Sequence, residues 1–192
     1  MLPRGDKKKL RAAGKAVRRC IDPEDRIELD RRIREGLIRA EGIDWIGKIV
    51  LSYAACGGEP DLLPLEFALP RTRFCYPYCE NGGEFTALLP VPGGWISGMY
   101  GISAPDPETA VRIPAERIDI VLLPCTAFDA WGGRVGMGKG YYDRFLRFCP
   151  AATRILTAYE AQRAERVPME AHDGYAHRIA TESGCLPVRE QK

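Results

Sequence analysis

Hydrophobic and polar residues recur with a helical period at the start of the chain. The run 7–20 reads KKKLRAAGKAVRRC, which predicts an amphipathic helix. Its apolar stripe is formed by Leu10, Ala13, Val17 and Cys20. The basic side chains off that stripe are Lys7, Arg11, Lys15 and Arg18. A second helix is predicted to follow, with Asp22 as its N-cap and Pro23 at its first helical position.

Short, continuously apolar or β-branched runs predict strands farther along the chain. They lie at 47–54, 73–77, 84–91, 117–124 and 153–160. The clearest is 117–124, whose residues 120–123 are all apolar, as in a parallel strand covered on both faces. A helix predicted at 139–149 separates it from 153–160, so these segments indicate a βαβ unit.

Two connecting segments carry further predictions. After the first strand, Pro60 is placed to begin a short helix. The stretch 90–116 is rich in proline and glycine, which predicts a long functional loop with little regular structure.

Composition places the chain among soluble globular proteins. Its 192 residues are 45% hydrophobic and 28% charged, which suits one compact domain over 1–192. No apolar stretch approaches the roughly 18 residues of a membrane span, so we expect no membrane association and a cytoplasmic location. The seven scattered cysteines favour reduced thiols over a disulfide framework, and nothing completes a zinc site with Cys75 and Cys79.

Charge is unevenly distributed although the net charge is only +2. Residues 1–19 hold eight Lys or Arg against one Asp. Such a segment could be an anion-binding arm, but a solvated basic face is the more common outcome of a charge run. The sequence alone favours the solvated face.

Candidate chemistry is concentrated in "GRVGMGKGYYDRF", residues 133–145, directly after the clearest strand. Ligands bind beyond the carboxyl ends of strands in open α/β sheets, and glycines let the backbone approach a phosphate. Lys139 adds a point charge, so we predict a phosphate site. A Walker A loop is not supported because Gly140 replaces its Ser or Thr, and a dinucleotide fingerprint fails because Tyr141 replaces its third glycine.

Three side chains at the end of this run have candidate roles. Asp143 could supply an oxygen to the metal of a nucleotide; the alternative is an i,i+4 ion pair with Arg147. Tyr142 shares a helical stripe with Phe145, which favours a place in the core. Tyr141 lies off that stripe and could face the ligand.

With its flanks, "LPCTAFDAWGGRVGMGKGYYDRFL" resembles the signature of the 5-formyltetrahydrofolate cyclo-ligase family. The resemblance extends over most of the chain. Further matching positions are Lys7, Leu10, Arg11, Glu59, Asp61, Gln162, Val167, Pro168, His172 and Asp173. Two positions depart from the family pattern: Met137, where Tyr or Arg is frequent, and Ala104, where Glu is usual.

The resemblance implies a three-layer α/β/α sandwich with a mostly parallel central sheet. It also implies an ATP- and Mg²⁺-dependent conversion of 5-formyltetrahydrofolate to 5,10-methenyltetrahydrofolate, with release of ADP and phosphate through a phosphorylated formyl group. A monomer is expected, and nucleic acid is not an expected partner.

By motif position, the resemblance also assigns residues. The ATP site would comprise Lys7, Arg11, Arg134, Gly136, Gly138, Lys139, Gly140, Tyr141 and Tyr142. Catalysis would rest on Lys139, Arg134 and Tyr141, folate binding on Glu59, Met137 and Tyr141, and metal binding on Asp143 and Asp173.

Two alternatives remain open. The chain could be a relative that binds nucleotide or nucleic acid without folate chemistry, for which the basic first helix is the main support. It could instead act on a different formylated substrate, since Met137 and the 54–61 turn depart from the family pattern.

Overall fold

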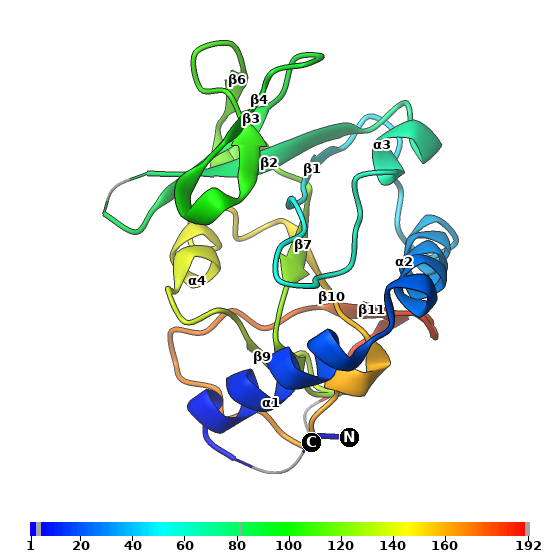
Figure 1. Cartoon of the computed structure of the whole chain (residues 1–192). Helices are drawn as coiled ribbons and strands as arrows, with labels where there is room; N and C mark the ends of the chain where they lie inside the picture. Colours follow the sequence, from blue (N-terminus) through cyan, green and yellow to red (C-terminus); the bar gives the residue numbers. More distant parts are fainter. Residues whose placement is uncertain (3–4, 81, 191–192) are drawn as a thin grey trace.

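The computed structural model describes residues 1–2, 5–80 and 82–190, and its framework is one large sheet (Figure 1). Within that part of the chain, the sheet has eight strands in the order β12-β11-β10-β7-β1-β2-β3-β6. Its strands are β1 (Ile49–Leu51), β2 (Arg73–Cys79), β3 (Phe85–Leu89), β6 (Val111–Ile113), β7 (Ile120–Pro124), β10 (Thr153–Thr157), β11 (Arg178–Thr181) and β12 (Gly184–Pro187). The strands from β11 to β2 pair in parallel, and β12, β3 and β6 pair antiparallel at the edges. The predicted mostly parallel sheet is confirmed.

Four α-helices, three short 3₁₀-helices and two small hairpins lie outside the large sheet in the described part of the structure. The α-helices are α1 (Lys7–Cys20), α2 (Pro23–Ile38), α3 (Leu65–Ala68) and α4 (Tyr141–Phe145). The hairpins pair β4 (Trp95–Ser97) with β5 (Ser103–Pro105), and β8 (Ala127–Phe128) with β9 (Arg134–Val135). No helix in the described ranges has both the length and the apolar character that a membrane crossing requires.

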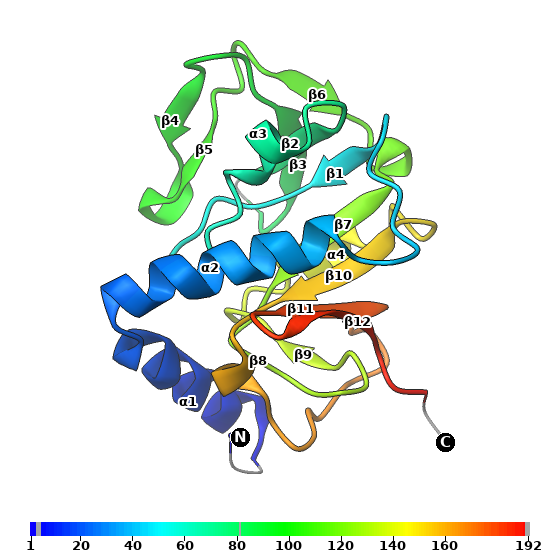
Figure 2. The same cartoon turned by 90° about the vertical axis from the view of Figure 1, so that its right-hand side faces the viewer.

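The sheet buries both of its faces, as the apolar run in β7 predicts. Ile120 and Leu122 point to the face covered by α2, which contributes Ile33 and Leu37 to the same core cluster. Val121 and Leu123 join the opposite cluster, which Phe145 and Leu146 cover from the α4 side. Figure 2 shows α2 lying along its face of the sheet. Helices on both faces of the sheet confirm the α/β sandwich.

The first two helices begin where the sequence predicts. The Asp6 carboxylate accepts a hydrogen bond from the backbone N–H of Lys9 in α1, and Asp22 accepts one from that of Glu24 in α2. Both carboxylates therefore satisfy backbone donors at a helix start.

The predicted burial of α1 is wrong at two positions. Arg18, predicted to lie off the buried stripe, is buried, and Cys20 is exposed. The buried face runs instead through Leu10, Gly14 and Arg18. At Gly14 the helix touches the loop after β7: an added Cβ would lie 1.7 Å from the carbonyl oxygen of Thr126. This contact holds α1 across the carboxyl ends of the parallel strands (Figure 1).

Other boundaries also differ from the predictions. Pro60 begins no helix, since α3 starts at Leu65 after Pro64. The segment 90–116 has more regular structure than predicted, because β4, β5 and β6 lie within it. The helix predicted at 139–149 is shorter in the structure, where it is α4. It cannot begin before Tyr141, because Gly140 has a φ of 67°, which is not a helical conformation.

Candidate active site

A cavity of about 580 Å³ opens at the carboxyl ends of the parallel strands. Every site residue predicted from the sequence lines it: Lys7, Arg11, Glu59, Arg134, Gly136, Met137, Gly138, Lys139, Gly140, Tyr141, Tyr142, Asp143 and Asp173. These residues come from α1, the loop after β1, the continuous segment from β9 through the glycine-rich loop into α4, and the segment before β11. The fold therefore gathers four distant segments around one space.

Two cations reach the cavity from α1. Lys7 Nζ lies 2.6 Å from an Asp173 carboxylate oxygen and 3.1 Å from one of Glu170. Arg11 donates from Nε to the carbonyl oxygen of Gly136 at 2.8 Å. The basic face of α1 is therefore directed in part to the cavity, and the preference for a solvated face is wrong for these residues. The basic first helix was the main support for the alternative of a nucleic-acid-binding relative, and these contacts weaken that support.

A second buried ion pair joins β9 to α4. Arg134 Nη2 lies 2.6 Å from Asp143 Oδ1, and the Arg134 side chain is 4% exposed. The backbone N–H of Gly174 also donates to Asp143 Oδ1, at 3.3 Å. Asp143 thus pairs with Arg134 and not with Arg147, the partner considered from helical spacing.

The two carboxylates predicted to bind metal are each matched to a cation. Burial by itself would raise the pKa of the Asp173 carboxyl, but hydrogen bonds from Lys7 and from the Glu170 backbone, together with the Lys7 charge, hold it below its ordinary value. Among the described residues, no cluster of three or more His, Cys, Asp or Glu side chains could hold a metal alone. Two carboxylates do fit a Mg²⁺ that arrives with a nucleotide, because Mg²⁺ is commonly bound by one or two carboxylates plus substrate phosphates.

The glycine-rich loop brings backbone against the α1 cations. Gly138 has a φ of 99°, and an added Cβ would lie 3.2 Å from the guanidinium carbon of Arg11. A side chain at this position would therefore be strained and would press on Arg11. Because α4 is only one turn long, the positive character of this end of the cavity comes mainly from side-chain cations.

Tyrosines form an aromatic wall beside the loop. The Tyr142 ring packs edge-on to Phe85, with centroids 5.3 Å apart, so its predicted core role is confirmed although it also lines the cavity. Tyr141 donates its hydroxyl toward Met99 Sδ at 3.6 Å, and its oxygen lies 3.5 Å from that of Tyr100.

Tyr100 lies at the turn between β4 and β5. Its φ of 62° makes it the one non-glycine residue with a left-handed backbone in the described chain. Lys139 Nζ lies 6.0 Å from the centroid of the Tyr100 ring. Sequence reasoning found Tyr141 and Tyr142 but missed Tyr100, because the segment 90–116 carries no periodic signal.

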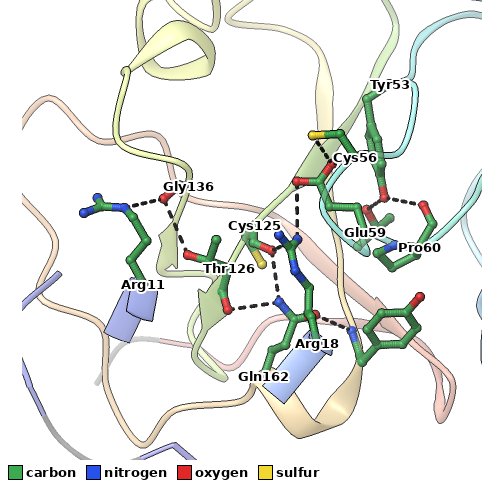
Figure 3. Close-up of polar contacts among 12 residues, drawn as sticks. Arg11, Arg18, Tyr53, Cys56, Glu59, Pro60, Cys125, Thr126, Gly136 and Gln162 are labelled. Carbon is green, nitrogen blue, oxygen red and sulfur yellow. Dashed lines mark hydrogen bonds and ion pairs between the residues drawn. The ribbon is translucent and has the colours of Figure 1, made fainter. Parts of the chain in front are cut away.

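The opposite part of the cavity contains a buried carboxylate, Glu59, which is 6% exposed (Figure 3). Its Oε1 lies 3.3 Å from Arg18 Nη1, and its Oε2 accepts a hydrogen bond of 3.2 Å from the backbone N–H of Cys56. Burial raises the pKa of the Glu59 carboxyl, and the Arg18 charge and the bonds from Cys56 oppose that rise. We refer to Tyr53, Cys56 and Glu59 as the carboxylate end, and to Lys7, Arg11, Arg134 and residues 136–140 as the cationic end.

Comparison with known proteins shows which family has this fold. The model of the 5-formyltetrahydrofolate cyclo-ligase family matches residues 3–182. The chain belongs to this family. The prediction of an enzyme, a cyclo-ligase, is thereby confirmed.

Individual relatives agree with the family match. The chain is 36% identical over 164 residues to the 5-formyltetrahydrofolate cyclo-ligase of Escherichia coli strain K12, covering 81% of this chain and 89% of that protein. It is 28% identical over 186 residues to the protein of the same name from Mycolicibacterium smegmatis, covering 86% and 93%. The solved structure of Aquifex aeolicus 5,10-methenyltetrahydrofolate synthetase matches with a TM-score of 0.82 at 30% identity, over 97% of this chain and 94% of that one.

The two departures from the family signature both lie at the cavity. Met137 is 46% exposed in the glycine-rich loop. Ala104 is buried in β5, where an added Cβ on Gly98 would lie 3.1 Å from its methyl group. The cyclo-ligase fold therefore accommodates a small apolar residue at 104 by close packing within the β4–β5 hairpin.

Proposed function

We propose that this cyclo-ligase converts 5-formyltetrahydrofolate to 5,10-methenyltetrahydrofolate, using ATP and Mg²⁺ and releasing ADP and phosphate. One observation carries the proposal: a single cavity combines a cationic end built on glycine backbone with a buried carboxylate end. The first suits a triphosphate, and the second suits a polar ring that presents N–H donors. The names of the relatives support this pairing of substrates.

At the cationic end, Lys7, Arg11, Arg134 and Lys139 would neutralise the triphosphate. Free glycine-loop N–H groups would add hydrogen bonds to its oxygens. Lys7 and Arg134 are at present paired with Asp173 and Asp143. Binding of a nucleotide with its Mg²⁺ would exchange these internal pairs, giving the phosphates to the cations and the metal to the carboxylates. When bound, Mg²⁺ would neutralise charge on the phosphates.

At the carboxylate end, Glu59 would hold the pterin of the folate. Each carboxylate oxygen can accept more than one hydrogen bond, so the contacts with Arg18 and Cys56 leave acceptor sites for ring N–H and NH₂ donors. Met137, within the cationic end, and Tyr141, next to it in the chain, both line the cavity and would contact the folate where it approaches the triphosphate.

The chemistry requires positioning more than a protein nucleophile. Transfer of the γ-phosphoryl group to the formyl oxygen would release ADP and form an N5-iminium phosphate. N10 then attacks the formyl carbon, loses its proton, and phosphate departs with the formyl oxygen. The protein's contribution is to align the formyl oxygen with the γ-phosphate and to stabilise the charge that moves between them.

One assay tests the proposal. Purified protein is mixed with 5-formyltetrahydrofolate, ATP and Mg²⁺, and the absorbance of the methenyl product is followed. We expect product only when ATP is present. Absence of ATP-dependent product would refute the proposal, and ATP hydrolysis without product would favour the alternative of another formylated substrate.

The role of Asp143 has its own test. Asp143→Asn should raise the Mg²⁺ concentration needed for half-maximal activity by about tenfold or more, while the circular dichroism spectrum stays unchanged. The matched control is Asp25→Asn, an exposed carboxylate on α2. Unfolding of Asp143→Asn would instead show that the ion pair with Arg134 is mainly structural.

A further inference from the structure

A buried arginine lies behind the carboxylate end of the cavity. The Arg18 side chain is 1% exposed and does not line the cavity itself. Its Nη1 lies 3.3 Å from Glu59 Oε1 and donates to the carbonyl oxygen of Cys125 at 3.4 Å. Figure 3 shows its guanidinium between the loop after β7 and the loop that carries Glu59. Arg18 therefore acts on a ligand through residues that line the cavity, and Glu59 is the charged one among its contacts.

The Glu59 carboxylate is held from two sides. Arg18 contacts Oε1, while the backbone N–H and the Sγ of Cys56 approach Oε2 at 3.2 and 3.5 Å. The loop that carries Glu59 also lies close to the arginine, since an added Cβ on Gly57 would be in ordinary van der Waals contact with Arg18 Nη2, at 3.6 Å. These contacts restrict the direction in which the carboxylate can point.

Burial disfavours the charge of Glu59 and raises the pKa of its carboxyl, and the Arg18 charge is the first of the contacts that oppose this rise, followed by the hydrogen bonds from Cys56. Glu59 in turn raises the pKa of Tyr53, Cys56, Cys125 and Tyr142, none of which carries a positive charge. The cations Lys15 and Arg134 act on three of these neighbours, Cys56, Cys125 and Tyr142. Without Arg18, only the hydrogen bonds from Cys56 would remain among the leading contacts that oppose desolvation, and the carboxyl would take up a proton at a higher pH.

We propose that Arg18 is a positioning residue that keeps Glu59 ionised and directed into the cavity, so that Glu59 can accept hydrogen bonds from the folate ring. The inference rests on the proposed function, to which it adds a residue outside the cavity. Lys7, Arg11, Gly14 and Arg18 recur at i, i+4, i+7 and i+11, which places them along one face of α1. One helix face thereby serves both ends of the cavity.

The test compares Arg18→Met, Arg18→Lys and the control Arg19→Met, which removes the neighbouring exposed arginine. Arg18→Met should raise the KM for 5-formyltetrahydrofolate at pH 7 by about tenfold or more, with the KM for ATP within about twofold of wild type. Arg18→Lys should recover part of the loss, and Arg19→Met should behave as wild type. Equal effects of Arg18→Met on both KM values would overturn the inference.

The pH dependence separates positioning from a structural role. In Arg18→Met the KM for folate should fall as the pH rises from 6.5 to 9, because Glu59 ionises again. The wild-type KM should change little over the same range. In a Glu59→Gln background, Arg18→Met should cause little further loss of folate affinity. A pH-independent loss, or one that adds fully to that of Glu59→Gln, contradicts the proposal.

A direct titration keeps the inference independent of the proposed reaction. ¹³C NMR of the Glu59 carboxyl, assigned with Glu59→Gln, should show a higher pKa in Arg18→Met than in wild type. Wild-type protein that forms no product refutes the proposed function, while this titration still tests the action of Arg18 on Glu59. An active wild type with an unchanged Glu59 pKa in Arg18→Met, or in Arg18→Lys if the Met variant does not fold, refutes the inference alone.

Discussion

The helices α1 and α2 look alike in the sequence but use their charges differently. Both are amphipathic, both begin after an aspartate, and they have 14 and 16 residues. In α2 acidic and basic residues are interspersed, and Arg31 forms ion pairs with Glu28 and Glu35 on the exposed surface. In α1 all charges are positive, and Lys7 and Arg18 pair with carboxylates distant in the sequence.

This difference teaches how a charge run can be interpreted. A helix with charges of both signs at i,i+3 and i,i+4 can neutralise itself in solvent. A helix with charges of one sign has no such internal partners, so its charges are solvated or meet anions from elsewhere. In this cyclo-ligase the anions are Glu59, Glu170, Asp173 and, by proposal, the triphosphate.

The largest expected contrast concerns a glycine in each helix. Gly14→Ala should lower the free energy of unfolding by about 3 kcal/mol, because the added Cβ would overlap the Thr126 carbonyl oxygen. Gly36→Ala in α2 meets Gly184 Cα at 3.1 Å and gains helix propensity, so its net effect should stay within about 1 kcal/mol. Urea denaturation measures both values. Equal stability of the two variants would show that α1 is not held closely at Thr126.

The next contrast concerns cations. Arg11→Met should raise the KM for ATP by about tenfold or more with little change in the folate KM, because a charge beside the glycine-rich loop is lost. Arg32→Met, an exposed arginine on α2, serves as the control. A larger effect of Arg11→Met on folate than on ATP would place the phosphates elsewhere in the cavity.

A smaller effect is expected for the ion pair of α1 with Asp173. The folded-state pKa of Asp173 lies below its ordinary value of 3.8, so the carboxylate contributes stability above that pH and loses it as the pH falls through the folded-state pKa. Asp173→Asn should therefore cost up to about 1 kcal/mol at pH 7 and progressively less below pH 3.8. Thermal unfolding of both proteins between pH 3 and pH 7 measures this difference. A difference that grew toward low pH would contradict the assignment.

The smallest effect belongs to the surface of α2. Arg31→Ala removes exposed ion pairs with Glu28 and Glu35, which contribute little because solvent screens them. We expect unchanged kcat and KM values and a thermal midpoint close to that of wild type. A loss of activity in this variant would mean that α2 takes part in the site, and the contrast with α1 would fail.

The sequence by itself determined the features that depend on local patterns. Hydrophobic periodicity placed α1, the Asp22 cap followed by Pro23 placed the start of α2, and the continuous apolar run of β7 identified a strand buried on both faces. The long glycine-rich signature identified the family, and its residues line one cavity. These features can be predicted because the residues that define each of them lie within one helix, one strand or one loop.

The tertiary structure alone decided which polar groups meet across the sequence. Helical spacing offered Arg147 as the partner of Asp143, whereas packing of β9 against α4 supplies Arg134. The pattern of α1 placed Arg18 away from the apolar stripe, but the close contact at Gly14 turns that face inward and buries the arginine against Glu59. Contacts of this kind depend on how elements distant in the chain approach one another, and residue spacing within one element does not encode that approach.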